Sequence, residues 1–596
     1  MDLLAAALCV GLFVYLFLEN GRGFGFVDEG FYYSLTQRLA MGDKFLIHEW
    51  HPGQFAALFE FLPFRLYTAL AGGTDGVILF MRYVYLSVDL VLFWLYYRRL
   101  RAYKVTGLAA VVLFCAYLFA GICALNYYTI CLHAMMTVAL ILFPEGKEPS
   151  GAALVFTGVA VSCAVLSQPA FAVLYFIYTL IVLLRAAALK RRPGAARRWE
   201  FALGMRVWGR MTLGVVVCAA VFLVFLFVAN GGVTETLRSI PNLFTDSEYA
   251  IHFYGNYSNP NKVRMMAKMY GAAPLILLLL SPALAGICKR FFPKKQAKAA
   301  VLIFICGVVL YSVIRACVVL FSAPDHIVYF LFGLNFYVLF FTPACYILCE
   351  KKNRRVFAFW CLAAGVCAVM DYVSEITVDY GASLAYFPAI YFFVCLLREL
   401  RAPADRSAAV SRILNTAAAA AGCLLLLWNV FAIGMTFSCK PVEKAYNTGE
   451  DKSVSVRLTD GPYRGIATTK RNSEIYGMIL SDMDLIREKC GGALYVAQNL
   501  PYYYLAADCP IGTYSTWYVE KDSADRLQYY WDLHPEKRPE YIYIPFYEYY
   551  SFRTFDSLYQ NRWAAMQLDY FKSICSFTPD PAGRAGYVLR VEKWKR

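Results

Sequence analysis

Long apolar runs recur along this chain up to residue 437, and they constrain its fold more than any other feature. Most of these runs are close to 20 residues long, the length that a helix needs to cross a hydrocarbon core of about 30 Å. Because lipid offers no hydrogen-bond partners to an open backbone, the runs are expected to be helices. Hydrophobic residues make up 60% of the chain and charged residues 17%, so the sequence predicts a polytopic α-helical membrane protein.

Basic loops between the apolar runs allow thirteen spans to be placed. They are expected at about 3–18, 77–97, 105–125, 128–143, 152–167, 170–189, 211–229, 271–288, 299–320, 327–349, 356–370, 384–397 and 413–437. With a cytoplasmic N-terminus, every strongly basic loop then falls on the cytoplasmic side, as the positive-inside rule requires. The net charge of +15 is explained by these loops, and nucleic acid is not expected as a partner.

A long polar and aromatic loop, residues 19–76, separates the first two predicted spans and would lie outside the cytoplasm. Within it, Phe31, Leu35 and Leu39 recur every four residues, which predicts an amphipathic helix. A second apolar helix is expected over residues 55–70. Neither segment is both long and apolar enough for a span, so we expect two interfacial helices along the membrane surface.

After residue 437 the composition becomes that of a soluble domain. Helices are expected over residues 473–489 and 523–533, and strands over residues 493–497, 541–544 and 587–591. Helices that alternate with strands indicate a small α/β fold. The chain therefore divides into a transmembrane module, residues 1–437, and a C-terminal domain, residues 438–596, which thirteen spans place outside the cytoplasm.

Four cysteines fall in this C-terminal domain, namely Cys439, Cys490, Cys509 and Cys575. In an oxidising compartment they would be able to form two disulfides, with three ways of pairing. Free thiols are the alternative. The remaining cysteines lie mostly in apolar runs, without a CxxC pair or the spacing of a zinc site.

Two adjacent acids, Asp28 and Glu29, follow the first span at the start of the first loop helix. One reading is structural, because acids are favoured at a helix N-terminus as caps and as partners of the helix dipole. The other is chemical, because a carboxylate at this boundary would be able to act as a general base on a hydroxyl or an amine. Neighbours on a helix point about 100° apart, so the two acids are not expected to share one task.

The segment His48-Glu49-Trp50-His51-Pro52-Gly53-Gln54 holds two histidines and a glutamate close together. A metal site is one reading, but the spacing is that of a loop and lacks the helical i, i+4 histidine pair of a HExxH site. Polar contacts of His51 and Gln54 to a substrate are a second reading. Structural hydrogen bonds within a turn are the third. No metal and no other cofactor is favoured.

Charged residues inside spans are expensive in lipid and tend to be functional or paired. Arg82 and Asp89 lie seven residues apart on one face of the second span, and Arg315 lies toward the outer end of the ninth. A guanidinium is suited to holding a phosphate in a bidentate way, so Arg82 and Arg315 are candidate phosphate contacts, with internal salt bridges or snorkelling as the alternative. Asp379 lies in another outer loop and is a candidate to line an outward-facing cavity. The alternative is that it lies on a solvated face of that loop.

The order of these features resembles the GT-C superfamily of integral-membrane glycosyltransferases, in particular the branch of protein O-mannosyltransferases and bacterial aminoarabinose lipid A transferases. A first span is followed by Asp28-Glu29, Tyr32 or Tyr33, Arg38 and Gly42-Asp43. Two surface helices and an arginine-bearing second span come next. Thirteen spans and an outward C-terminal domain complete the resemblance.

The resemblance implies a GT-C-like helical bundle that transfers a hexose or pentose from a polyprenyl-phosphate-sugar donor, outside the membrane and with inversion at the anomeric carbon. The acceptor would be a lipid, a glycan or a protein. Asp28 would be the general base and Glu29 its supporting acid. The expected substrate contacts are Arg82, His51, Gln54, Tyr32, Arg315 and Asp379. Relatives with a lipid monophosphate donor often need no metal, so none is expected here.

Two other classes of protein remain as alternatives. A transporter or flippase of lipid-linked glycans usually has repeated halves, and the sequence shows no such repeat. A non-catalytic envelope protein would use its C-terminal domain for binding and would tolerate any residue at Asp28.

Overall fold

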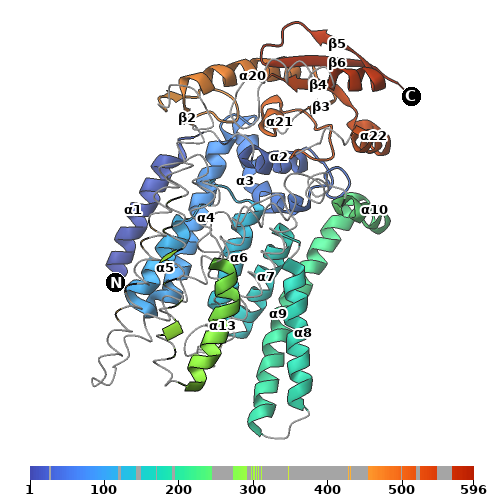
Figure 1. The fold of residues 1–596 in the computed structure, drawn as a ribbon. Coiled ribbons are helices and arrows are strands. Elements are labelled where there is room, and N and C mark those ends of the chain that lie inside the picture. Colours follow the sequence, from blue (N-terminus) through green and yellow to red (C-terminus); the bar gives the residue numbers. More distant parts are fainter. Residues whose placement is uncertain are drawn as a thin grey trace.

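A bundle of long helices carries a smaller layer of helices and strands at one end (Figure 1). The computed structural model describes residues 1–23, 25, 28–118, 122–142, 149–169, 171–190, 195–244, 273–291, 454–497, 500–517, 524–546 and 567–595, with isolated positions between 297 and 430. The bundle comprises α1 (Asp2–Asn20), α4 (Val77–Leu100), α5 (Lys104–Ala116), α6 (Tyr127–Leu142), α7 (Gly151–Ser167), α8 (Phe171–Lys190), α9 (Ala195–Asn230) and α13 (Ala273–Phe291). Short elements follow some of them, namely η2 (Arg101–Tyr103), α10 (Val233–Ser239) and η4 (Ile240–Phe244).

Within the described residues, 4 helices are long and apolar enough to cross a membrane. They are α1, α4, the segment Phe171–Ala188 of α8 and the segment Gly204–Asn230 of α9. The prediction of a membrane protein built from apolar helices is therefore confirmed. The predicted spans nine to thirteen lie outside the described residues, apart from isolated positions, so the number of spans stays a prediction.

Two bundle helices differ in length from the predicted spans. Helix α5 ends at Ala116, whereas the span was expected to reach residue 125. Helix α9 begins at Ala195, inside the expected basic loop, and is 36 residues long. Arginine and alanine are good helix formers, so hydropathy marks where α9 enters an apolar environment and does not mark where the helix begins.

Helices α7 and α9 pack with their backbones in close contact. A Cβ atom on Gly158 would clash with the carbonyl oxygen of Met211, and one on Gly214 would clash with that of Val155. Only glycine fits at such a crossing, which is the way that small residues let helices approach each other in membranes.

The first loop contains α2 (Asp28–Ala40), η1 (Pro52–Ala56) and α3 (Ala57–Ala71), close to the two predicted helices. Helix α3 exposes Leu62, Leu66 and Leu70 on one side, as expected of a helix that lies along a membrane. Helix α2 does not match this prediction, because every residue from Glu29 to Arg38 is buried. Its polar side is covered by the C-terminal part of the chain, so it is an internal helix.

The C-terminal part contains a four-stranded sheet in the order β3-β4-β6-β5. Its strands are β3 (Ala493–Val496), β4 (Pro539–Pro545), β5 (Cys575–Asp580) and β6 (Gly586–Trp594). Strands β3 and β4 are parallel, and the pairs β4–β6 and β5–β6 are antiparallel. The other elements are β1 (Val456–Arg457), β2 (Ala467–Thr468), α20 (Lys470–Lys489), α21 (Tyr502–Ala507), α22 (Ala524–Leu533) and η7 (Pro535–Lys537). The expected helices and strands are all present, and Cys490, Cys509 and Cys575 are free thiols.

This C-terminal part lies directly on the first loop and covers α2 (Figure 1). The Trp50 N–H donates to the carbonyl of Tyr514 at 2.8 Å, and the Thr74 hydroxyl donates to that of Leu505 at 2.8 Å. A Cβ atom on Gly30 of α2 would lie 2.9 Å from the backbone nitrogen of Tyr502. Helix α2 is thus enclosed between the bundle and the C-terminal part. The domain boundary at residue 437 falls outside the described residues and stays a prediction.

Candidate active site

The backbone that leads into α2 is held by the C-terminal part of the chain. The Gly23 N–H donates to the carbonyl of Ala467 at 3.0 Å, so the segment pairs with β2. The Tyr463 hydroxyl donates to the carbonyl of Gly25. These contacts set where α2 begins, and they thereby set the position of Asp28.

Glu29 is joined to Arg82 of α4 by a buried, bidentate ion pair. The Arg82 Nε lies 2.5 Å from Glu29 Oε1 and its Nη2 lies 2.6 Å from Oε2, with side-chain exposures of 3% and 1%. The remaining N–H groups of Arg82 donate to the carbonyls of Asn20 at 2.7 Å and of Gly23 at 3.0 Å. The guanidinium therefore neutralises Glu29 and ties α4 to the chain between α1 and α2.

Asp28 differs from Glu29 both in its burial and in its lack of an ion pair among the described residues. Its side chain is half-buried, and within the described parts of the chain it makes no hydrogen bond and no ion pair. Burial, together with the negative charge of Glu29, raises the pKa of Asp28 to about 6. The carboxylate is therefore mostly ionised at pH 7 but holds a proton far more readily than an ordinary aspartate, which suits a general base.

Aromatic rings surround this end of α2. The ring of Tyr32 meets that of Tyr127 edge to face with their centroids 5.5 Å apart. On the neighbouring side of the helix, Phe31 lies 4.7 Å from the His51 ring and 5.0 Å from the Trp517 ring. Burial and nearby acids, Asp28 among them, raise the pKa of Tyr32 well above its usual value, so its hydroxyl keeps its proton. The wall beside Asp28 is thus apolar with one protonated phenol.

Two residues of this wall were missed by the sequence analysis. Glu60 of α3 is 1% exposed, and its Oε2 accepts a hydrogen bond of 2.8 Å from Thr36 while Oε1 has no partner among the described residues. Burial raises the pKa of Glu60 to about 8, so it is neutral at pH 7. The sequence feature that could have revealed Glu60 is a single acid within the apolar stretch 55–70. Tyr127 had no signal beyond its place in a short turn.

His51 and Gln54 hold the turn before α3 together. The His51 Nδ1 accepts the Gly53 N–H at 2.9 Å, and the Gln54 amide accepts the Leu46 N–H at 2.7 Å and donates to the His51 carbonyl at 2.9 Å. Burial lowers the pKa of His51 to about 3, so the ring is neutral. These contacts fit the structural reading of the turn. The predicted substrate contacts of both residues stay untested.

The remaining predicted site residues are Arg82, Arg315 and Asp379. Arg82 is occupied by Glu29, so it does not present a free guanidinium to a phosphate. Asp89 of α4, which is completely buried, has His133 Nε2 at 3.7 Å and does not pair with Arg82. Arg315 and Asp379 lie outside the described residues, and their roles stay predictions.

The far end of α2 carries a second buried charge network. The Arg38 guanidinium donates to Asp43 at 2.8 Å, to Glu49 at 2.7 Å and to the Tyr530 hydroxyl at 3.4 Å. Lys537 of η7 pairs with Asp43. Two cations and two carboxylates thus balance one another where the first loop meets the C-terminal part. The neighbouring cations hold the pKa of Asp43 below its usual value.

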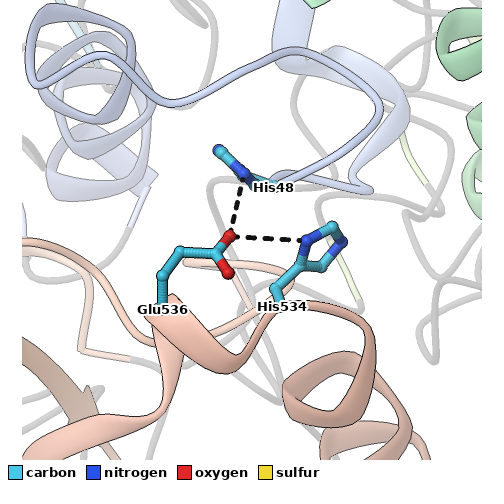
Figure 2. A group of neighbouring side chains, drawn as sticks. All are labelled: His48, His534 and Glu536. Atoms are coloured by element: carbon cyan, nitrogen blue, oxygen red, sulfur yellow. Dashed lines mark ion pairs between the residues drawn. The ribbon is translucent and has the colours of Figure 1, made fainter.

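The metal site considered for His48, Glu49 and His51 is not formed by those three side chains, because Glu49 pairs with Arg38 and His51 with a backbone N–H. His48 instead faces His534 and Glu536 of the C-terminal part (Figure 2). Burial lowers the pKa of His48 to about 3 and lowers that of His534 as well, so both rings are neutral at pH 7.

A small apolar pocket lies between α6, α7, α8 and α9. It is lined by Met135, Val138, Leu142, Val161, Ala164, Phe171, Leu174, Tyr175, Tyr178 and Met211. Met135 follows Tyr127 by eight residues on α6, a rise of about 12 Å at 1.5 Å per residue. The pocket therefore begins some two helical turns below the aromatic wall of Asp28.

Neither a family model nor a curated protein matches this sequence. Among solved structures, the Archaeoglobus fulgidus oligosaccharyltransferase, tethered with an acceptor peptide, is similar over 97% of this chain and 74% of its own, at 13% identity and a TM-score of 0.45. ArnT from Cupriavidus metallidurans bound to undecaprenyl phosphate is similar over 99% of this chain and 97% of its own, at 16% identity and a TM-score of 0.39. The apo structure of the same protein is similar over 98% of this chain and 97% of its own, at 14% identity and a TM-score of 0.40. At TM-scores below 0.5 these similarities assign no family, residue, donor or acceptor to this chain.

Proposed function

We propose that this chain is a membrane glycosyltransferase that moves a sugar from a polyprenyl-phosphate-linked donor to an acceptor at the outer face of the membrane. Asp28 is the general base in this proposal. The observation that carries it is the contrast within one dipeptide, where Glu29 is fully neutralised by Arg82 and Asp28 has no partner among the described residues. An unpaired carboxylate with a pKa of about 6 has a free lone pair for a proton and the affinity to take it near neutral pH.

The proposed reaction is a single displacement. The acceptor oxygen or nitrogen attacks the anomeric carbon from the face opposite the phosphate, while its proton passes to the Asp28 carboxylate. The bond between the anomeric carbon and the phosphate oxygen breaks, and the lipid phosphate leaves with the electron pair. Attack from the opposite face inverts the anomeric carbon. General-base help of this kind contributes typically about 10²–10⁴-fold in rate.

Glu29 and Arg82 have a positioning role in this proposal. Their ion pair fixes the first turn of α2 against α4, so that Asp28 is held in place although it has no partner of its own. Preorganised groups of this kind reduce the cost of reaching a reactive geometry. Contact with the leaving phosphate is then left to other cations, of which Arg315 is the sequence-based candidate.

The apolar pocket between α6 and α9 supports a lipid-linked donor. Its lining is almost wholly hydrocarbon and aromatic side chains, so it suits part of an isoprenoid chain. Tyr127 connects this pocket to the aromatic wall, because its ring contacts Tyr32 and its helix continues into the pocket lining. A donor with its tail in the pocket would bring its phosphate toward the end of α2.

The test is substitution of Asp28 by Asn in the full chain in its own membrane, with mass spectrometry of lipid-linked sugars and surface glycans. We expect transfer to fall by about 10²–10⁴-fold while the amount of inserted protein stays the same. Glu488→Gln, which removes an exposed acid of α20, is the matched control and should leave transfer unchanged. Full transfer by the Asp28→Asn protein would remove Asp28 from the mechanism. Movement of radiolabelled lipid without a new glycosidic bond would favour a flippase.

A further inference from the structure

His48, His534 and Glu536 converge from two distant parts of the chain. His48 lies in the α2–η1 loop (residues 41–51), His534 directly follows α22 and Glu536 belongs to η7. Figure 2 shows the three side chains turned toward one another, with the Glu536 carboxylate between the two rings. One nitrogen from each ring and one carboxylate oxygen all lie within 4.8 Å of one another.

The separations within this cluster are too long for good hydrogen bonds. His48 Nε2 lies 3.5 Å from Glu536 Oε1, and His534 Nδ1 lies 3.6 Å from the same oxygen. An N–H···O hydrogen bond is normally 2.7–3.2 Å long. Ligands at about 2.0–2.1 Å from a tetrahedral ion are about 3.3–3.4 Å apart, which is close to the two separations between a histidine nitrogen and the carboxylate oxygen.

The surroundings provide the outer support that a metal-bound histidine needs. If Nε2 of His48 binds a cation, Nδ1 must carry the proton, and a carboxylate usually accepts it. The Asp43 Oδ1 lies 3.7 Å from this Nδ1, and Asp43 is itself held by Arg38 and Lys537. The His48 Nδ1 accepts the Lys44 N–H at 3.0 Å, so cation binding would exchange this partner for Asp43.

We propose that His48, His534 and Glu536 form a binding site for a zinc-class divalent cation that fastens the C-terminal part of the chain to the α2–η1 loop. Two neutral imidazoles and one carboxylate are a ligand set that zinc prefers, with the fourth position left to water. Glu536 is 59% exposed, so the ion has an open route to the site. The site joins segments about 490 residues apart in the sequence. The bound ion therefore stabilises the contact between these segments and takes no part in sugar transfer.

The test uses the full chain without a histidine tag, purified in detergent and stripped with EDTA. Titration with Zn²⁺ should give one bound ion per chain and a higher Tm, and Co²⁺ should give the strong visible absorption of a tetrahedral site. His534→Ala and Glu536→Gln should each weaken Zn²⁺ binding by at least about 10–100-fold, a loss that outer-shell changes already cause. Glu488→Gln, which removes an exposed acid elsewhere in the C-terminal part, should bind Zn²⁺ as the native chain does.

Two results would overturn the proposal. One is the absence of stoichiometric Zn²⁺ binding by the stripped native chain. The other is unchanged affinity in both His534→Ala and Glu536→Gln, which would place the ion elsewhere. Because His534 and Glu536 lie toward the surface, the variants are expected to fold, and an unchanged Tm without metal would verify this. The readout is metal binding, so it does not depend on whether the chain transfers sugar.

Discussion

The two ends of α2 treat buried charge in opposite ways. At its C-terminal end, Arg38 is surrounded by partners and every charge of the network is balanced. At its N-terminal end, Glu29 is balanced by Arg82, but Asp28 is left with no partner among the described residues and with a raised pKa. A paired buried charge serves the fold, whereas an unpaired one is a liability that a fold keeps only where another use requires it. The predictions that follow test this difference.

The largest effect is expected from Arg38→Met at the balanced end. The change leaves Asp43 and Glu49 buried without their shared cation, and breaking a buried pair in this way typically costs about 3–5 kcal/mol. Thermal unfolding in detergent should show a large fall in Tm. Asp28→Asn, at the other end of the same helix, removes no partner and should leave the Tm unchanged or slightly higher. Equal losses in both variants would end the distinction between the two ends.

Much of this architecture could be predicted from local sequence, and the parts that could not be predicted are non-local. Apolar length predicted α4 and α6, and β3 and β4 were also predicted from local sequence. The pair Asp28-Glu29 stood out because acids at a helix start have a recognisable chemistry. Which of the two acids forms an ion pair could not be predicted. Its partner Arg82 is 53 residues away, and helix packing determines that Arg82 pairs with Glu29 and not with Asp89.

The burial of α2 shows the same limit. The apolar spacing of Phe31 and Leu35 predicted a helix with one covered face, which is correct for that face. The opposite face carries Gln37, whose amide donates to the carbonyl of Tyr504 at 3.1 Å and to Asp508 at 3.0 Å. No local pattern reveals that polar residues of one segment will be satisfied by another segment more than 460 residues later.

A second prediction concerns the pair that separates Glu29 from Asp28. Arg82→Met and Glu29→Gln should each destabilise the chain, and the double variant should lose less than the sum, with a coupling of about 1–3 kcal/mol. Arg82→Met should also lower the rate of transfer without a selective loss of donor affinity, because the native Arg82 guanidinium is paired with Glu29. Additive losses, or a KM effect on donor alone, would restore Arg82 as a direct phosphate contact.

A third prediction concerns the close approach of α2 to the C-terminal part. A Cβ atom on Gly30 would lie 2.9 Å from both Cβ and the backbone nitrogen of Tyr502, and backbone atoms cannot move aside cheaply. Gly30→Ala should therefore destabilise by about 1–3 kcal/mol, measured by thermal unfolding. The matched control is Gly477→Ala on the exposed side of α20, where a Cβ meets nothing within 4 Å and should stabilise by about 0.5–1 kcal/mol. Similar outcomes at both glycines would refute the tight docking of α2.

The smallest effect is expected from a change of pH. It distinguishes the two ends of α2 without any substitution, because Asp28 and Asp43 titrate in different pH ranges. Asp28 has a pKa of about 6, so it is about 90% ionised at pH 7 and about 10% ionised at pH 5. If it is the general base, the transfer rate should fall roughly tenfold between these values, because the protonated acid cannot accept a proton. The rate of sugar transfer at saturating donor, measured across this range, is the readout.

Stability should move in the other direction over the same range. The folded chain binds the Asp28 proton more tightly than the unfolded chain, whose aspartate has a pKa near 3.8, so this residue adds stability as the pH falls from about 6 toward 4. Asp43 has a lowered pKa, so its contribution is fully present above about 4 and is lost only below that. A fall in rate at pH 5 with an unchanged or higher Tm would therefore point to Asp28, whereas a fall of both together would indicate acid unfolding. In Asp28→Asn, any residual rate should lose this pH dependence, and if the dependence persists the titrating group is another residue.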